Sequence, residues 1–124
     1  MPYKILVVDD EPPIVRLMEF ILARQGHQML VAVNGEEALA QVREHKPDLV
    51  LLDIMMPRID GYEVARTLRA DPETCEMPII MLSAKAQEED IQKGMDVGVN
   101  EYITKPFGPD HLVRVVNKYL GEAE

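Results

Sequence analysis

Asp48-Leu49-Val50-Leu51-Leu52-Asp53-Ile54-Met55-Met56-Pro57 is the stretch that determines how this chain folds. Its four consecutive apolar residues, Leu49 to Leu52, have the length of a strand that is buried on both faces, as in a parallel sheet. The strand then ends in a carboxylate, that of Asp53. Ligands of open α/β sheets bind just outside the carboxyl ends of the strands. Asp53 is therefore badly placed for packing and well placed for chemistry.

Short apolar runs alternate with helical patterns along the whole sequence. We predict strands at 4–8, 27–33, 49–52, 78–82 and 101–104, and helices at 12–25, 35–46, 62–70, 87–97 and 109–120. Asn34 and Glu37 form a capping-box pattern at the second helix. The alternation indicates an α/β fold, a doubly wound parallel sheet of five strands with helices on both faces. A barrel would need eight such units and roughly twice the length.

Composition limits the function classes. The 124 residues fit one domain, and 13 basic against 22 acidic residues give a net charge of −9, which argues against direct nucleic-acid binding. No apolar run approaches the roughly 18 residues of a membrane span, and the N-terminus has no signal-peptide pattern. The single cysteine, Cys75, has no partner for a disulfide or a metal site. We therefore expect a cytoplasmic protein without a membrane partner.

Polar side chains of complementary kinds follow four of the predicted strands: Asp9 and Asp10, Asp53, Ser83 and Lys105. Each has an ordinary explanation by itself, because acidic residues and serines cap helices and Asp or Lys-Pro is common in turns. Parallel strands, however, bring their carboxyl ends to one edge of the sheet. The set as a whole therefore favours a shared site.

Phosphoryl transfer uses all of these groups. Clustered carboxylates repel one another unless a cation neutralises them, and Mg²⁺ prefers one or two carboxylates with waters and a phosphoryl oxygen. Asp53 could then attack phosphorus and form an aspartyl phosphate. Lys105 would pair with the phosphoryl oxygens, and the Ser83 hydroxyl would donate a hydrogen bond to one of them.

Four motifs occur in a specific order between Lys4 and about Leu120: Val7-Val8-Asp9-Asp10-Glu11, Leu51-Leu52-Asp53-Ile54-Met55-Met56-Pro57 with Asp60-Gly61, Leu82-Ser83-Ala84, and Tyr102-Ile103-Thr104-Lys105-Pro106-Phe107. With them the chain resembles the receiver domain of a two-component response regulator. The resemblance implies a flavodoxin-like sheet with strand order 2-1-3-4-5. We expect residues 1–124 to be a single receiver domain, with an effector domain absent or beyond the chain end.

The resemblance also implies a donor and a metal. A histidine kinase or a phosphotransfer protein would donate the phosphoryl group to Asp53. Mg²⁺, for which Mn²⁺ could substitute, would be bound directly by Asp10 and Asp53, through water by Asp9, and by the backbone carbonyl of Met55.

The family further implies how the phosphoryl group is held and read. The backbone N–H groups of Met55 and Ala84 would hold it with Ser83 and Lys105, and the Lys105-Pro106 peptide bond would be cis. Phosphorylation would draw the Ser83 hydroxyl inward, and Tyr102 would swing from an exposed to a buried position. The changed face would comprise the fourth helix, the fifth strand and the fifth helix, where a downstream effector binds.

The sequence departs from the family at informative positions. Ser83 replaces the commoner Thr, which keeps the hydroxyl, and neither Met55 nor Lys85 can orient an attacking water, so we expect slow self-dephosphorylation. Residues 107–112 resemble the winged-helix class of regulators, which implies a phosphorylation-dependent dimer through the switch face. Ile91, His111 and Val115 stand where that class has charges, which argues against the standard dimer.

Three other functions remain open. A Mg²⁺-dependent phosphohydrolase would need a second Asp two residues after the nucleophile, where this chain has Met55. A receiver-like interaction module that never takes phosphate would not need the complete acidic set. A flavin-binding domain would need a Gly/Ser/Thr phosphate cradle after the first and third strands, which the sequence lacks.

The resemblance also implies where the kinase docks. Receiver domains bind their kinase on the first helix, here residues 16–24.

Overall fold

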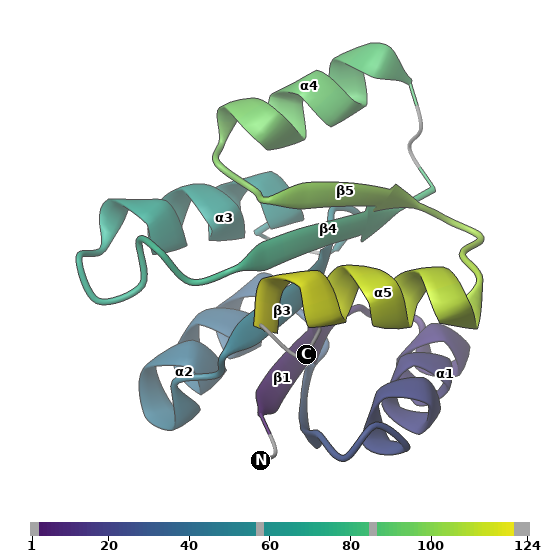
Figure 1. The fold of residues 1–124 in the computed structure, drawn as a ribbon. Helices are drawn as coiled ribbons and strands as arrows, with labels where there is room; N and C mark the ends of the chain where they lie inside the picture. The colour runs from purple at the N-terminus through teal and green to yellow at the C-terminus, as the bar shows by residue number, and fades with distance from the viewer. Residues whose placement is uncertain (1–2, 57–58, 85–86, 121–124) are drawn as a thin grey trace.

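The computed structural model describes residues 3–56, 59–84 and 87–120, and its five strands form one parallel sheet (Figure 1). The strands are β1 (Lys4–Val8), β2 (Gln28–Ala32), β3 (Leu49–Asp53), β4 (Ile79–Ser83) and β5 (Glu101–Thr104), in the order β2-β1-β3-β4-β5. The predicted fold class and strand order are confirmed. Arg58, in the expected turn after β3, and Lys85 lie outside the described residues.

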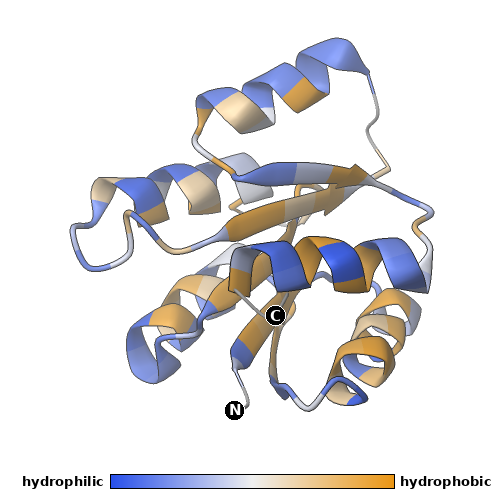
Figure 2. Cartoon of the chain, in the orientation of Figure 1, coloured by the Kyte–Doolittle hydropathy of each residue, from blue (hydrophilic) through white to orange (hydrophobic). Residues whose placement is uncertain are grey.

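Five helices pack on the two faces of this sheet: α1 (Pro12–Ala23), α2 (Gly35–His45), α3 (Gly61–Ala70), α4 (Glu88–Asp96) and α5 (Pro109–Leu120). Successive strand residues point to opposite faces, so the sheet supplies both hydrophobic cores. One core packs the sheet against α1 and α5, and the other packs it against α2 and α3. Figure 2 shows mostly hydrophobic residues along β4, whereas β5 and the helices contain both hydrophilic and hydrophobic residues. No helix in the described residues is long and apolar enough to cross a membrane.

The strand order creates a crevice at one edge of the sheet. β1 pairs with β2 on one side and with β3 on the other. The direction in which successive strands are added across the sheet therefore reverses between β1 and β3. At such a switch point the loops after the two strands lead to opposite faces and leave space between them. Asp53 ends β3 at this point.

Side-chain caps and one close contact fix the helices beside the crevice. Asn34 accepts a hydrogen bond from the Glu37 N–H at 2.8 Å, and Glu37 reaches back to the N–H of Val33 at 3.0 Å, one residue earlier than in the usual capping box. A Cβ on Gly61 would clash with the backbone of Asp53 and Ile54. Glycine therefore lets α3 begin directly against the end of β3.

Helix α4 contacts the sheet mainly through a glycine. Its sequence offers only Ile91 and Met95 as a thin apolar face, but Met95 is 45% exposed and Gly94 is the buried residue of the helix. A Cβ on Gly94 would lie 3.1 Å from Cδ2 of Tyr102 and 3.3 Å from Sδ of Met81. Val115, one of the positions at which the winged-helix class has charges, is buried in the core.

A half-buried arginine joins the loops at the opposite edge of the sheet. Arg69 on α3 donates to the carbonyl oxygens of Gly98 at 2.8 Å and Met77 at 2.7 Å, and to Oδ1 of Asn100 at 2.8 Å. The same Asn100 oxygen accepts the N–H of Ile79 at 2.8 Å. Burial lowers the pKa of Arg69. Its planar guanidinium donates hydrogen bonds to backbone carbonyls that precede both β4 and β5.

Replacing Arg69 by alanine should lower the free energy of unfolding by about 2 kcal/mol, because two part-buried carbonyls and the Asn100 side chain lose a charged donor. Urea denaturation followed by circular dichroism measures the loss. Arg66→Ala on the same helix is the control, since Arg66 is exposed and pairs with the exposed Glu63, and it should change stability by less than about 0.5 kcal/mol. Equal losses in the two variants would show that the Arg69 contacts contribute nothing specific.

Candidate functional site

The carboxylates that the sequence indicated do meet at the crevice. Asp9 and Asp10 follow β1, Asp53 ends β3, and one oxygen of each side chain lies within 4.8 Å of the others. Asp9 and Asp53 are buried, with exposed fractions of 0% and 4%, whereas Asp10 is exposed. Two carboxylates therefore form the floor of the site, and the third faces solvent.

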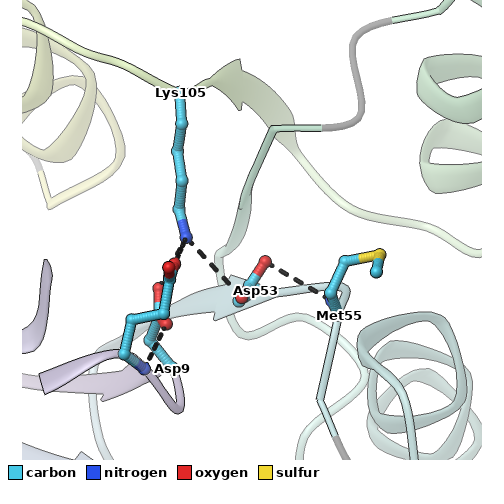
Figure 3. Close-up of polar contacts among 5 residues, drawn as sticks. Asp9, Asp53, Met55 and Lys105 are labelled. Carbon is cyan, nitrogen blue, oxygen red and sulfur yellow. Dashed lines mark hydrogen bonds and ion pairs between the residues drawn. The ribbon is translucent and has the colours of Figure 1, made fainter.

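Lys105 extends from the loop after β5 into this cluster (Figure 3). Its Nζ lies 2.9 Å from Oδ2 of Asp9, 3.1 Å from Oε1 of Glu11 and 3.6 Å from Oδ2 of Asp53. Its backbone N–H donates to the carbonyl of Ser83 at 2.9 Å, and the peptide bond to Pro106 is cis, as the resemblance implied. The ammonium thus bridges the ends of β1 and β3.

Glu11 is a member of the cluster that the sequence reasoning missed. Its N–H donates to Oδ1 of Asp9 at 2.9 Å while its carboxylate pairs with Lys105. The signal was its position in the acidic motif after β1, which we attributed only to Asp9 and Asp10. With Glu11, three carboxylates pair with Lys105, and Asp10 is the fourth carboxylate of the cluster.

The charges of the cluster shift its titration. Burial raises the pKa of Asp53 to about 6; the ammonium of Lys105 lowers it, the carboxylate of Asp9 raises it, and the N–H groups of Met55 and Ile54 lower it. Burial alone would lower the pKa of Lys105, but its hydrogen bond to Asp9 and the charge of Asp53 outweigh burial and raise it. The surrounding ammonium and N–H groups thus do not fully compensate the negative charge of ionised Asp53.

The donor set suits a hard divalent cation. The clustered oxygens of Asp9, Asp10 and Asp53 are the ligands that Mg²⁺ prefers, and the excess of carboxylates over ammonium groups leaves negative charge for a cation to neutralise. The Met55 N–H donates to Oδ1 of Asp53 at 3.4 Å, which places the Met55 backbone against the cluster. Its side chain is 59% exposed and points away from Asp53 (Figure 3).

Ser83 and Tyr102 lie together beside the cluster. Ser83 ends β4 and is fully buried, and Tyr102 on β5 is half-buried. The Tyr102 hydroxyl is hydrogen-bonded with the side chains of Ser83 and Tyr62, and burial raises its pKa. Ala84, which follows Ser83, is exposed. The two residues expected to form a switch are therefore in contact.

A cleft of about 560 Å³ opens between the loop after β3 and helix α4, and its lining includes Asp10, Met55, Tyr62 and Lys93. Sequence reasoning did not select Tyr62 or Lys93, because neither belongs to a strand end. A larger hollow of about 860 Å³ is lined by residues of α2 and by residues 71–78. Its lining does not include Asp9, Asp10 or Asp53, whereas Asp10 lines the cleft of about 560 Å³.

Residues 5–117 match the family described as the response regulator receiver domain. Over 124 residues, the whole chain, the sequence is 44% identical to the alkaline phosphatase synthesis transcriptional regulatory protein PhoP of Bacillus subtilis (strain 168). The match covers 51% of that protein, so the chain spans about half the length of this relative.

Solved structures agree with this match. A response regulator of Chloroflexus aurantiacus J-10-fl has a TM-score of 0.94 and 36% identity, with 98% of this chain and 99% of that chain covered. The receiver domain of the sensor histidine kinase PA1611 of Pseudomonas aeruginosa PAO1 has a TM-score of 0.90 and 30% identity, with the same coverage. Its structure has a magnesium ion coordinated in the active site cleft.

The raised pKa of Asp53 predicts a pH-dependent gain of stability on its neutralisation. Its pKa is about 6 when folded against 3.8 ordinarily, so the stability that this group contributes is fully present below about pH 4 and is lost as the pH rises through about 6. In metal-free buffer, Asp53→Asn should raise the free energy of unfolding by about 2 kcal/mol near pH 7.5 and by little near pH 4.

Urea denaturation in the presence of a chelator measures this difference. Asp96→Asn, which changes the net charge equally at an exposed position on α4, is the control and should have the same small effect at both pH values. A gain for Asp53→Asn that does not depend on pH would contradict the assignment of its cause to ionisation.

Proposed function

The chain belongs to the response regulator receiver domain family, and we propose that Asp53 is the residue through which it receives its signal. Asp53 accepts a phosphoryl group from a histidine kinase or a phosphotransfer protein in a reaction that needs Mg²⁺. The observation that carries this proposal is the burial of Asp53 at the carboxyl end of β3, where Lys105 contacts both Asp53 and Asp9. At this place an ionised carboxylate is held close to a cation and open to a ligand from the crevice.

Asp10 and Asp53 would hold the metal directly, Asp9 through water, and the Met55 carbonyl would complete the protein ligands, with Mn²⁺ as an alternative ion. When bound, the ion neutralises charge on the carboxylates and on the phosphoryl oxygens. The clustering of these carboxylates supports the proposal, as does the magnesium ion coordinated in the cleft of the similar PA1611 receiver domain.

The chain's own residues supply the remaining steps. An Asp53 oxygen forms a bond to phosphorus as the bond between phosphorus and the donor's histidine nitrogen breaks, and the imidazole of the donor leaves with the bonding pair. The attack requires ionised Asp53, and a pKa of about 6 leaves this form predominant at neutral pH. Lys105 neutralises a phosphoryl oxygen, and Ser83 with the N–H groups of Met55 and Ala84 donates hydrogen bonds to the others.

The domain is a signalling domain that phosphorylates itself from a donor rather than an enzyme with turnover. The Met55 side chain is a thioether that points away from Asp53, and it cannot orient a water for attack on the aspartyl phosphate. Self-dephosphorylation is therefore slow, and the residue that a phosphohydrolase would use as general acid is missing.

Phosphorylation is read through the face formed by α4, β5 and α5. The contact between Ser83 and Tyr102 links this face to the site, and Tyr102 in turn packs against Gly94 of α4. A downstream effector binds here, whereas the net charge of −9 argues against direct binding of nucleic acid by this domain.

A dimer through this face has weak support. Glu101 already accepts a hydrogen bond from the Tyr119 hydroxyl at 2.7 Å and lies 3.4 Å from Nζ of Lys118. These charges are therefore satisfied within one chain, while Ile91 and His111 offer no complementary pair.

The kinase docks on α1 beside α5. Leu17 and Phe20 are 43% and 63% exposed, and they line a hollow of about 280 Å³ together with Ile21, Arg24 and Val113. The guanidinium of Arg24 lies 5.5 Å from the centre of the Phe20 ring. An exposed aromatic of this kind is suited to anchor a partner.

Asp53→Asn should abolish phosphorylation. Incubation of the wild-type chain with acetyl phosphate and Mg²⁺ should add about 80 Da to the intact mass, and the gain should disappear with a chelator or in the variant. Asp60→Asn, at the exposed cap of α3, controls for loss of a nearby carboxylate and should keep the adduct. No adduct on a folded wild-type chain that binds Mg²⁺ would favour the phosphate-independent interaction module.

Phe20→Asp should slow phosphotransfer from a phosphorylated histidine kinase by about tenfold or more, because it removes an apolar anchor from the docking surface. Phosphorylation by acetyl phosphate should not change, since Asp53 and its neighbours are untouched. Met95→Asp, at an exposed apolar position on α4, is the matched control. If both variants slow kinase transfer equally, the kinase does not dock on α1.

A further inference from the structure

Lys93 projects into the cleft beside the phosphoacceptor without a role in the functions above. It lies on the exposed side of α4, in a cleft whose lining also includes Asp10, Met55 and Asp60. Among the residues that the structure describes, Lys93 is the basic residue of this lining, and it forms no ion pair there. Its charge is thus available to an anionic ligand.

A buried aromatic ring holds Lys93 in this place. Its Nζ lies 4.5 Å from the centre of the Tyr62 ring, within the range of a cation–π contact. Tyr62 is 3% exposed, and its hydroxyl donates to the carbonyl oxygen of Asp90 at 3.0 Å. Because the ring is fixed between α3 and α4, the ammonium above it is positioned over the cleft rather than free to range over the surface.

The negative charge of the site favours a cation at this position that can attract an anionic donor. A small phosphodonor is an anion that approaches a chain of net charge −9 through a cluster of carboxylates. Lys105 already contacts Asp9 and Glu11, so it compensates the cluster itself. The exposed side chain of Met55 offers no hydrogen-bond donor. Among the described residues, Lys93 is therefore the cation placed to contact the part of the donor that lies in the cleft.

We propose that this cleft binds the leaving group of a small acyl phosphate and that Lys93 determines the preference for such a donor. The proposal rests on the phosphoacceptor role of Asp53. An Asp53 oxygen forms a bond to phosphorus as the bond between phosphorus and the acyl oxygen breaks. The bonding pair goes to that oxygen, so the acid leaves as a carboxylate anion without a proton. Lys93 stabilises the negative charge that develops on it.

Two donors with different leaving groups test the proposal. Acetyl phosphate releases the acetate anion, whereas phosphoramidate releases neutral ammonia. With Mg²⁺ present, Lys93→Gln should slow phosphorylation of Asp53 by acetyl phosphate about threefold to fivefold, the range of one exposed charge contact. The rate with phosphoramidate should change by less than about 1.5-fold, because no anion leaves.

Matched variants separate this effect from simpler ones. Lys118→Gln makes the same change of net charge on α5, where Lys118 contacts Glu101, and it should leave both rates unchanged. Lys93→Arg should retain the preference for acetyl phosphate. The effect of Lys93→Gln should shrink in about 0.5 M salt, because exposed charges are screened.

Three results would overturn the inference. Equal slowing with both donors would place Lys93 in general support of the site rather than at the leaving group. An unchanged rate with acetyl phosphate would show that the cleft does not bind the leaving group there. Equal slowing by Lys118→Gln would reduce the effect to net charge. A wild-type chain that takes phosphate from neither donor would instead overturn the proposed function of Asp53.

Discussion

The ion pairing of Lys105 with the carboxylates at the ends of β1 and β3 is the interaction on which the rest of the site depends. Two buried carboxylates, those of Asp9 and Asp53, would repel each other strongly without a cation between them. Lys105 compensates them only in part, since it also contacts Glu11 and since Asp53 keeps a raised pKa. The site thus retains negative charge that a metal ion can neutralise. This uncompensated charge lowers the stability of the fold and leaves Asp53 available to react.

The fold provides the geometry that this pairing needs. The parallel sheet brings β1 and β3 side by side, and their carboxyl ends open at the point where the winding reverses. Apolar residues on both faces of these strands make the position of each terminal side chain rigid. Gly61 lets α3 begin against the end of β3. At the opposite edge of the sheet, Arg69 joins the loops that precede β4 and β5 by hydrogen bonds. A rigid scaffold therefore surrounds a site with uncompensated charge.

Among the described helices, α4 buries the fewest residues. It buries Gly94 rather than a stripe of apolar side chains, and its contacts include Tyr62 and Tyr102. A glycine within a helix also costs about 1 kcal/mol relative to alanine. An element with so little buried surface can change position for a small free energy, which suits a face that reports on the state of a neighbouring site. The cleft and Lys93 lie at this same junction.

The amino-acid sequence by itself determined the fold class, the strand order implied by its family, and the convergence of Asp9, Asp10, Asp53, Ser83 and Lys105. The fold class and the convergence follow from hydrophobic periodicity and from the rule that parallel strands end at one edge, which need no knowledge of side-chain conformation. The strand order follows from the resemblance of the ordered motifs to the family. Only the tertiary structure decided that Glu11 joins the cluster, that Met95 is exposed and Val115 buried, and that Lys93 lies over Tyr62. Those details depend on the rotation of each helix and on rotamers chosen by contacts between residues far apart in the chain, and local sequence does not encode either quantity.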